Sequence, residues 1–202
     1  MTEKVIEIKI GKMSVRLVNC PTVYFPAEDT MLLLRNVSYG ERTLEIGAGS
    51  GIVSIYLSLL GSTVDAYDID PEAVKCVKLN ASLNEVNFNI EQGDLFQKVS
   101  GKYDVVVFNP PYLPGDEFES FVDGSDQWFG GKDGMSVIRN FLSQLENFLK
   151  PSGKAFMIMS SRSDIQKLIA EFPQFLFKEL DSDSFFFERI YCFSLELLTQ
   201  PL

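Results

Sequence analysis

The chain has 202 residues, and its 46% hydrophobic and 23% charged content is that of an ordinary folded protein with a substantial core. The formal net charge of −10 disfavours non-specific binding to duplex nucleic acid, and the absence of histidine excludes His-based triads and His-ligated zinc. Cys20, Cys76 and Cys192 are odd in number and lack metal-ligand spacing, so we expect buried thiols, no disulfide framework and no metal site.

The N-terminal segment, residues 1–10, alternates charged and aliphatic residues and lacks the continuous apolar core of a signal peptide. No apolar run elsewhere approaches the roughly 18 residues that span a bilayer. We therefore expect a cytoplasmic protein without membrane contact. Alternation over Val5–Ile10 and Met13–Val18, around Gly11 and Lys12, predicts a β-hairpin. Such a hairpin would either cover a cofactor pocket or act as a stabilising flap.

A helix start follows this hairpin. Pro26 precedes two acids, Glu28 and Asp29, and an apolar run over residues 31–34 comes next. Proline near the first helical position and acids in the first turn are typical of a helix N-terminus. This helix tip either faces a cofactor or is a plain helix start.

A short buried strand over residues 43–46 then leads into a glycine-rich turn and an apolar-periodic helix over 52–60. Glycines let the backbone turn tightly and let a ligand approach main-chain N–H groups. Glu45 stands two residues before the first glycine, where a carboxylate would repel a diphosphate. The acid instead suits a ligand with a cationic amino-acid tail, such as S-adenosylmethionine (SAM). The predicted cofactor-binding residues of this turn are Glu45, Gly47, Ala48, Gly49 and Gly51.

The second strand, residues 63–67, ends at another acid, Asp68. It stands about 20 positions after the first glycine, which fits the acid that grips ribose hydroxyls. Ile69 follows it in the same predicted site. Pro71 begins the next helix, and we expect Asp70 to be its N-cap.

A third acid follows the third predicted strand, residues 88–91. Asp94 is placed to accept the adenine amino group, and Leu95 to pack on the adenine ring. The alternative for Asp94 is a solvated turn residue.

Asn109-Pro110-Pro111-Tyr112 follows an apolar run over residues 103–108 that predicts a buried parallel strand. Two prolines cannot continue a sheet, so the chain leaves it in a stiff turn at the carboxyl end, where open α/β sheets bind ligands. The Asn109 side chain and the Pro110 carbonyl offer two acceptors for a planar NH2 group, and Tyr112 offers a stacking face. The loop is therefore a predicted catalytic receptor for an amide or an amino-substituted base. A plain proline turn is the alternative.

The remaining chain begins with a long acidic segment, residues 113–133, which contains the only tryptophan, Trp128. Loops of this length are usually lids or binding loops. We expect the phenylalanines of the closing strands to lie in the core. The elements predicted here are a helix over 135–149, a strand over 154–160, a helix over 163–172, and an antiparallel pair over 175–180 and 185–195.

In this order, the glycine turn with its acid, the two later acids and the Asn-Pro-Pro-Tyr loop resemble class I SAM-dependent methyltransferases that modify an NH2 nitrogen. Residues 25–30, 45–53, 108–114 and 128–134 together resemble the archaeal and eukaryotic branch of the HemK/PrmC family, and the resemblance runs from about Tyr24 to Gly153. It implies a Rossmann-like α/β fold with a seven-stranded, mostly parallel sheet, the last strand antiparallel and helices on both faces. We expect a single domain over 1–202, with residues 1–22 as a hairpin extension.

The resemblance also implies N5-methylation of the glutamine in the Gly-Gly-Gln motif of a class I translation termination factor, with S-adenosylhomocysteine as the second product. It implies a small zinc-binding activator that adds a strand at residues 86–91, with Phe88 and Ile90 available to it. Family members commonly have Asn where this chain has Asp70. Carried over by position, the cofactor contacts are Thr30, Glu45, Gly47, Asp68, Asp94, Leu95 and Asn109, and the amide contacts are Asn109, Pro110 and Tyr112.

Three rival functions fit parts of the pattern. A DNA or RNA adenine or cytosine N-methyltransferase would use the same receptor for an extruded base; the acidic loop and the lack of an appended basic domain argue against nucleic acid. Glu45 and the Asn-Pro-Pro-Tyr loop disfavour a NAD-dependent oxidoreductase, and the intact loop disfavours a non-catalytic SAM-binding scaffold. Fold physics does not separate a glutamine amide from a nucleobase amine; only the resemblance does.

Overall fold

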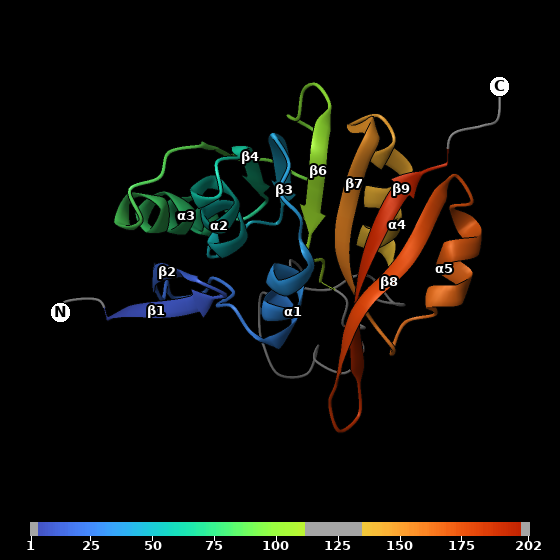
Figure 1. Cartoon of the computed structure of the whole chain (residues 1–202), viewed down its shortest axis with the longest axis horizontal. Coiled ribbons are helices and arrows are strands. Elements are labelled where there is room, and N and C mark those ends of the chain that lie inside the picture. Colours follow the sequence, from blue (N-terminus) through green and yellow to red (C-terminus); the bar gives the residue numbers. More distant parts are fainter. Residues whose placement is uncertain (1–3, 112–134, 199–202) are drawn as a thin grey trace.

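A computed structural model of the chain describes residues 4–111 and 135–198 (Figure 1). The predictions for Tyr112, for the acidic segment 113–133 and for Trp128 fall outside these described residues. None of the helices in the two described ranges has the length and apolar character that crossing a bilayer requires.

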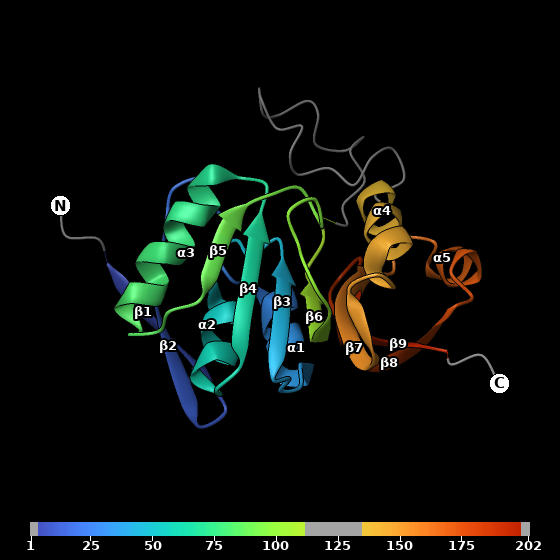
Figure 2. The same ribbon diagram turned by 90° about the horizontal axis from the view of Figure 1, so that it is seen from above.

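A seven-stranded sheet organises the chain, with its strands in the order β5-β4-β3-β6-β7-β9-β8 (Figures 1 and 2). Strands β3 to β7 run parallel, and β9 enters antiparallel between β7 and β8. This confirms the predicted mostly parallel sheet with its last strand antiparallel. The strands are β3 (Arg42–Ile46), β4 (Thr63–Asp68), β5 (Asn89–Gln92), β6 (Tyr103–Phe108), β7 (Leu149–Ser160), β8 (Phe175–Ser184) and β9 (Arg189–Leu197).

Helices cover both faces of this sheet, as predicted (Figure 2). The central strand β6 shows why its sequence is a continuous apolar run. Val105 and Val107 pack against α1 and α2 on one face, whereas Val106 and Phe108 pack against α4 on the other. The described helices are α1 (Glu28–Asn36), α2 (Ile52–Leu59), α3 (Pro71–Leu83), α4 (Ser136–Leu145) and α5 (Ile165–Glu171).

The N-terminal hairpin forms with the predicted bounds, as β1 (Val5–Ile10) and β2 (Met13–Val18). Its inner side chains, Val15 and Leu17, are buried with the apolar residues of α1 and α2. The backbone N–H of Arg16 donates to the Asn84 side chain just past α3, over 2.8 Å. Of the two roles considered for the hairpin, this packing supports that of a stabilising flap.

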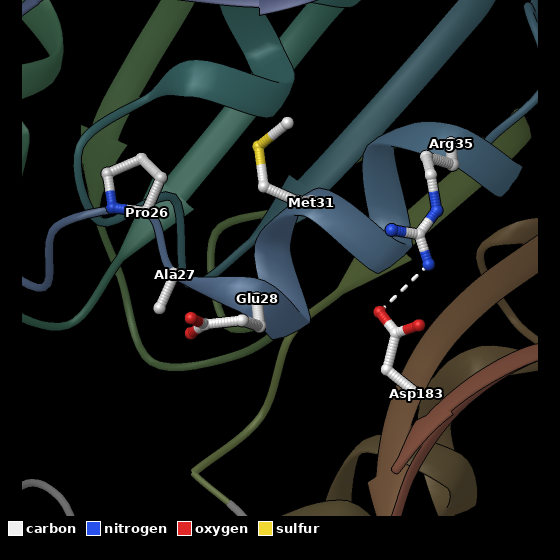
Figure 3. Close-up of a pocket in the computed structure, with 6 residues that line it drawn as sticks. All are labelled: Pro26, Ala27, Glu28, Met31, Arg35 and Asp183. Atoms are coloured by element: carbon white, nitrogen blue, oxygen red, sulfur yellow. Dashed lines mark hydrogen bonds and ion pairs between the residues drawn. The ribbon is translucent and has the colours of Figure 1, made fainter. Parts of the chain in front are cut away.

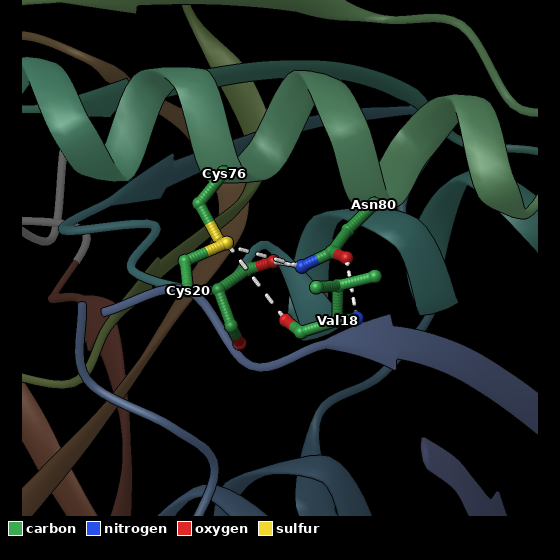
Figure 4. Close-up of a disulfide and its surroundings, with 5 residues drawn as sticks. Val18, Cys20, Cys76 and Asn80 are labelled. Atoms are coloured by element: carbon green, nitrogen blue, oxygen red, sulfur yellow. Dashed lines mark hydrogen bonds between the residues drawn. A yellow bond between two sulfur atoms is a disulfide. The ribbon is translucent and has the colours of Figure 1, made fainter. Parts of the chain in front are cut away.

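A disulfide joins the end of this hairpin to α3 (Figure 4). It links Cys20 to Cys76, whose Cα atoms are 6.0 Å apart. The prediction of free thiols is therefore wrong for this pair, because a spacing of 56 residues carries no signal of the contact that packing creates. Cys192 is buried and free, as predicted.

Element bounds differ most from the predictions between α4 and the first half of β7. Helix α4 ends at Leu145, and Leu149 already belongs to β7. The prediction had placed Pro151 and the residues after it in a turn. The register against β6 shifts between Tyr103 and Val105, and this irregularity lets the strand contain a proline.

The last strand pair also differs from the prediction. Strand β8 runs on to Ser184 and β9 begins only at Arg189, so three consecutive phenylalanines lie in the turn between them. Phe186 is 98% exposed and Phe187 is 92% exposed. Phe185 is 44% exposed, so the prediction that the phenylalanines of this region lie in the core is wrong for all three.

Candidate active site

Asn109 directly follows β6, at the carboxyl end of the parallel strands. Its side-chain Nδ2 donates a hydrogen bond to Oδ2 of Asp29 over 3.1 Å. Its Oδ1 is buried and has no hydrogen-bond partner within the described part of the chain. The amide is thus held at its Nδ2 end, and its Oδ1 end is a buried acceptor whose hydrogen-bonding capacity is unused by the described residues.

Asp29 dictates which way this amide faces. An ionised carboxylate only accepts hydrogen bonds, so the NH2 end of Asn109 must point to it and Oδ1 must point away. A buried acceptor without a donor costs about 1–3 kcal/mol. A ligand that brings an N–H group to Oδ1 would remove this cost.

A small hydrogen-bond network fixes Asp29 in turn. Its Oδ1 accepts from the Tyr24 hydroxyl over 2.7 Å and from the Thr30 backbone N–H over 2.5 Å. Burial, and then the hydrogen bond to Asp29, raises the pKa of Tyr24, so this hydroxyl stays a donor. From the sequence, Asp29 was expected only as an acid of a helix tip that either faces a cofactor or is a plain helix start. Its partner Asn109 lies 80 positions away, so no local pattern indicates their hydrogen bond.

The glycine turn lies against the same strand end. Gly47 has a φ of +68°, and a Cβ there would stand 3.5 Å from the Phe108 ring and 4.0 Å from the Asn109 carbonyl oxygen. At Gly51, with φ +83°, a Cβ would come within 2.9 Å of Val77 on α3. Glycine at these two positions lets the turn approach both β6 and α3.

Glu45 is buried at the end of β3, beneath this turn. Its carboxylate accepts from the backbone N–H of Ser54 over 2.9 Å and also from the Ser54 hydroxyl. Burial raises the pKa of Glu45 to about 8, although the Ser54 hydrogen bonds act in the opposite direction. A cationic ligand group beside Glu45 would favour the ionised carboxylate, so this residue fits the ammonium group of a bound amino-acid tail.

Asp68 is buried at the carboxyl end of β4. Its two oxygens accept from the backbone N–H groups of Gly49 over 2.8 Å and of Asp70 over 2.9 Å. A carboxylate has about four lone-pair sites, so it keeps capacity for ribose hydroxyls. Asp70 caps α3 by accepting from the Glu72 backbone N–H over 2.8 Å, as predicted.

Comparison with known proteins identifies the family to which the chain belongs. Residues 25–125 match the family described as methyltransferase small domain. Over 178 residues the chain is 40% identical to "Putative protein N5-glutamine methyltransferase MJ0928" of Methanocaldococcus jannaschii, a match that covers 86% of this chain and 88% of that protein. The chain belongs to this methyltransferase family.

Two further relatives are eukaryotic. The methyltransferase is 32% identical over 162 residues to "Methyltransferase HEMK2" of Homo sapiens, covering 73% of this chain and 76% of that protein. Mtq2 in the Mtq2-Trm112 complex of E. cuniculi, described as responsible for methylation of the eRF1 translation termination factor, shares its fold. The TM-score is 0.67 at 23% identity, with 87% of this chain and 99% of that chain covered. The predicted archaeal and eukaryotic HemK-type branch is confirmed.

The methyltransferase carries its remaining predicted cofactor residues at the same edge of the sheet. The Gly93 backbone N–H donates to the Asp68 carbonyl over 2.9 Å, which brings the segment after β5 beside β4. There Asp94 is exposed, and Leu95 is buried with a φ of +46°. Ile69 is half exposed at the end of β4, whereas Thr30 is buried and bonded to Asp29.

Asn80 is a site-supporting residue that the sequence analysis missed. This buried α3 side chain accepts from the Val18 backbone N–H over 2.8 Å and donates to the Ser50 carbonyl over 2.9 Å (Figure 4). It therefore ties the hairpin, α3 and the glycine turn of the methyltransferase together. One helix residue among apolar neighbours gives no sequence signal for this role.

Proposed function

We propose that the chain transfers the methyl group of SAM to the side-chain amide nitrogen of the glutamine in a Gly-Gly-Gln motif of a class I translation termination factor. The observation that carries this proposal is the Asn109 amide, whose Oδ1 is a buried acceptor without a partner among the described residues while Asp29 holds its Nδ2. The names of the protein N5-glutamine methyltransferase of M. jannaschii and of the eRF1-methylating Mtq2 complex support this substrate.

Three groups of residues would hold the cofactor. Glu45 would face the ammonium of the methionine part, the backbone of residues 47–51 would follow its chain, and Asp68 would bind the ribose. The burial of both acids supports this fit, because each then needs the cation or the hydroxyls that SAM brings. SAM supplies the electrophilic methyl group.

The protein's own contribution is to make an amide nitrogen reactive. Such a nitrogen is a poor nucleophile because its lone pair is delocalised into the carbonyl group. The Asn109 Oδ1 and the Pro110 carbonyl would accept hydrogen bonds from its two N–H groups, which stabilises positive charge developing on nitrogen and fixes the angle of attack. The nitrogen–carbon bond forms as the sulfur–methyl bond of SAM breaks, S-adenosylhomocysteine leaves, and one of the two amide hydrogens is released to water as a proton. Pro111 stiffens the loop, and Tyr112 would stack on the amide plane. Asp29 adds a fixed negative charge one hydrogen bond behind Asn109.

We also propose that a small activator adds a strand to the sheet by pairing with β5, the edge strand of the described sheet. The family resemblance implies that this activator binds zinc. The expectation that Ile90 is available to the activator is wrong, because Ile90 is only 8% exposed and packs beneath α3. Phe88 is partly exposed and stays available. The test is hydrogen exchange of the amides of residues 89–92. An activator that binds without slowing this exchange would exclude pairing at β5.

We place the reaction in the cytoplasm, where termination factors act on ribosomes. Disulfides are rare in the cytosol, with the proteins of hyperthermophiles as a genuine exception. The Cys20–Cys76 bond is compatible with this location in such a host.

The experiment for the proposed function is methyl transfer from radiolabelled SAM to the purified termination factor of the host, with and without the activator. A second tube holds the factor with its Gly-Gly-Gln glutamine changed to alanine, and a third holds host tRNA and rRNA. Label on the unaltered factor alone supports the proposal. Label on RNA would replace the proposal with the nucleobase methyltransferase. No label on the factor or on RNA, while SAM still binds, would replace it with a non-catalytic SAM-binding scaffold.

A further inference from the structure

The turn between β8 and β9 exposes the largest apolar side chains of the described surface at its tip. Phe186 and Phe187 are almost fully exposed, and Phe185 before them is 44% exposed. Single exposed apolar residues are common on proteins, but contiguous aromatic ones usually mark a binding surface. We call residues 185–187 the aromatic tip.

The aromatic tip stands on a firmly bonded base. The Phe185 backbone N–H donates to the Glu188 carbonyl over 2.7 Å, and the Ser160 hydroxyl donates to the Glu188 carboxylate. Ser161 and Arg189 exchange two further bonds, of 2.8 and 2.9 Å. A turn held in this way loses little conformational entropy when it binds a partner.

The aromatic tip also lies at the edge of the sheet formed by the carboxyl ends of the parallel strands, where Asn109 is located. We call this the catalytic edge. Strand β7 runs parallel to β6 and ends at Ser160, opposite Ile190 at the start of β9. The turn before β9 therefore extends past the same edge at which Asn109 leaves β6 (Figure 1). Measured across the sheet, the three strand spacings from β6 to β8 amount to about 14 Å, and residues 185–189 carry the turn further along the strand direction, beyond the Ser160–Ile190 pair. A folded protein whose glutamine reaches Asn109 is wide enough to reach the tip as well.

An open pocket of about 270 Å³ lies between α1 and β8 and is lined by residues of both elements (Figure 3). Met31 and Pro26 give it an apolar wall, and the Glu28 carboxylate lies beside them. Arg35 on α1 pairs with Asp183 on β8 over 2.8 Å and joins the two walls. This pocket suits an apolar or basic side chain.

We propose that the aromatic tip and this pocket dock the protein substrate: a folded region of the termination factor, outside its Gly-Gly-Gln loop, with an apolar patch bordered by basic side chains. This inference rests on the proposed function. Charge supports such a partner, since the surface carries the acids Glu28, Asp181, Asp183 and Glu188 against the bases Arg35, Arg162 and Arg189. The same charge disfavours a nucleic acid there.

The test is the double variant Phe186→Ser/Phe187→Ser, assayed with the intact termination factor. We expect KM to rise at least about tenfold with kcat unchanged, because hot-spot aromatics dominate docking energy. The dissociation constant of a glutamine-to-alanine factor, measured with S-adenosylhomocysteine present, should rise by the same ratio. Leu176→Ser is the matched control, since Leu176 is 52% exposed at the far end of β8 and should change neither constant.

The remaining outcomes separate the two proposals. A wild-type chain that methylates the factor, with tip variants of unchanged KM and affinity, overturns the docking surface alone. A wild-type chain inactive on the factor overturns the proposed function, and the docking surface with it. Sedimentation of the wild type as a dimer and of the tip variant as a monomer would identify the tip as a self-association surface instead.

Discussion

The two ends of the catalytic edge are built in opposite ways. Over β3, β4 and β6 the chain buries polar groups, namely Glu45, Asp68 and Asn109. At the β8–β9 turn it exposes Phe186 and Phe187. We call the first region the buried end and the second the exposed end. The unpaired Oδ1 of Asn109 costs about 1–3 kcal/mol, and a phenylalanine left exposed forgoes about 1.5–3 kcal/mol of burial. If folding stability alone mattered, the polar group would be paired or exposed and the phenylalanines would be buried. The proposed binding roles of the two ends explain why neither is the case.

The largest expected effect is at the buried end, with Asn109→Ala. Without Oδ1 the substrate amide loses one of its two acceptors, and kcat should fall about 10²–10³-fold. SAM affinity should stay within about threefold, as judged by calorimetric titration. The control is Asn140→Ala on the solvent side of α4, which should leave kcat unchanged. Equal turnover in the Asn109 variant would refute its catalytic role.

The next effect concerns what holds the buried end in place. Replacing both Cys20 and Cys76 by serine should lower the free energy of unfolding by about 2–4 kcal/mol, because the unfolded chain is no longer constrained to a closed loop and gains conformational entropy. SAM affinity should fall as well, since Asn80 links the hairpin to the glycine turn. Urea unfolding measures the first effect. Wild-type protein in reductant should match the variant, and no shift in reductant would argue against the disulfide.

Glu45→Gln should separate stability from binding. The unfolded chain ionises near pH 4.5, whereas burial raises the pKa of folded Glu45 to about 8. The folded state therefore holds more protons in this window, and wild-type stability falls as pH rises through it. The glutamine variant lacks this slope, so the ligand-free variant should be more stable than the wild type at pH 8, by about 1–3 kcal/mol.

The same variant should bind SAM about 10- to 100-fold more weakly at pH 8, because a neutral amide does not pair with an ammonium group. Wild-type affinity should increase with pH up to about 8, since only the ionised Glu45 attracts that cation. Affinity measured from pH 6 to 9 checks both statements. A pH-independent wild-type affinity would place the ammonium group elsewhere.

The smallest effect is expected for Asp29→Asn. The new side chain keeps the shape of Asp29 but no longer forces the Asn109 amide to turn its NH2 end inward, so kcat should fall about tenfold with KM little changed. Tyr24→Phe removes only one bond to Asp29 and should cost less. Single-turnover rates measure both. A larger loss for Tyr24→Phe would mean that the tyrosine itself contacts substrate.

Local patterns predicted the buried end well. Strand β6, the N-terminal hairpin and the Asp70 cap depend on neighbours within a few residues, and each forms where the sequence placed it. The Asn109–Asp29 bond and the Cys20–Cys76 disulfide depend on contacts 80 and 56 positions apart, which no local pattern encodes.

The exposed end was predicted less well, for a physical reason. Three consecutive phenylalanines have neither the alternation of a half-buried strand nor the polarity of a turn, so they fit a buried strand by sequence alone. Pairing with β7 fixes the start of β9, because Ser160 stands opposite Ile190. That register moves residues 185–187 out of the sheet.

The Cys20–Cys76 loop has one more consequence. It encloses α1, β3, α2 and β4, together with the exposed connection at residues 38–39, where Tyr39 is 55% exposed. A protease that cuts at this connection yields two pieces still joined by sulfur. Such a clipped protein would run as one band on a non-reducing gel and as two on a reducing gel. A purity check in reductant would therefore count it as degraded, although its fragments are covalently linked until the reductant is added.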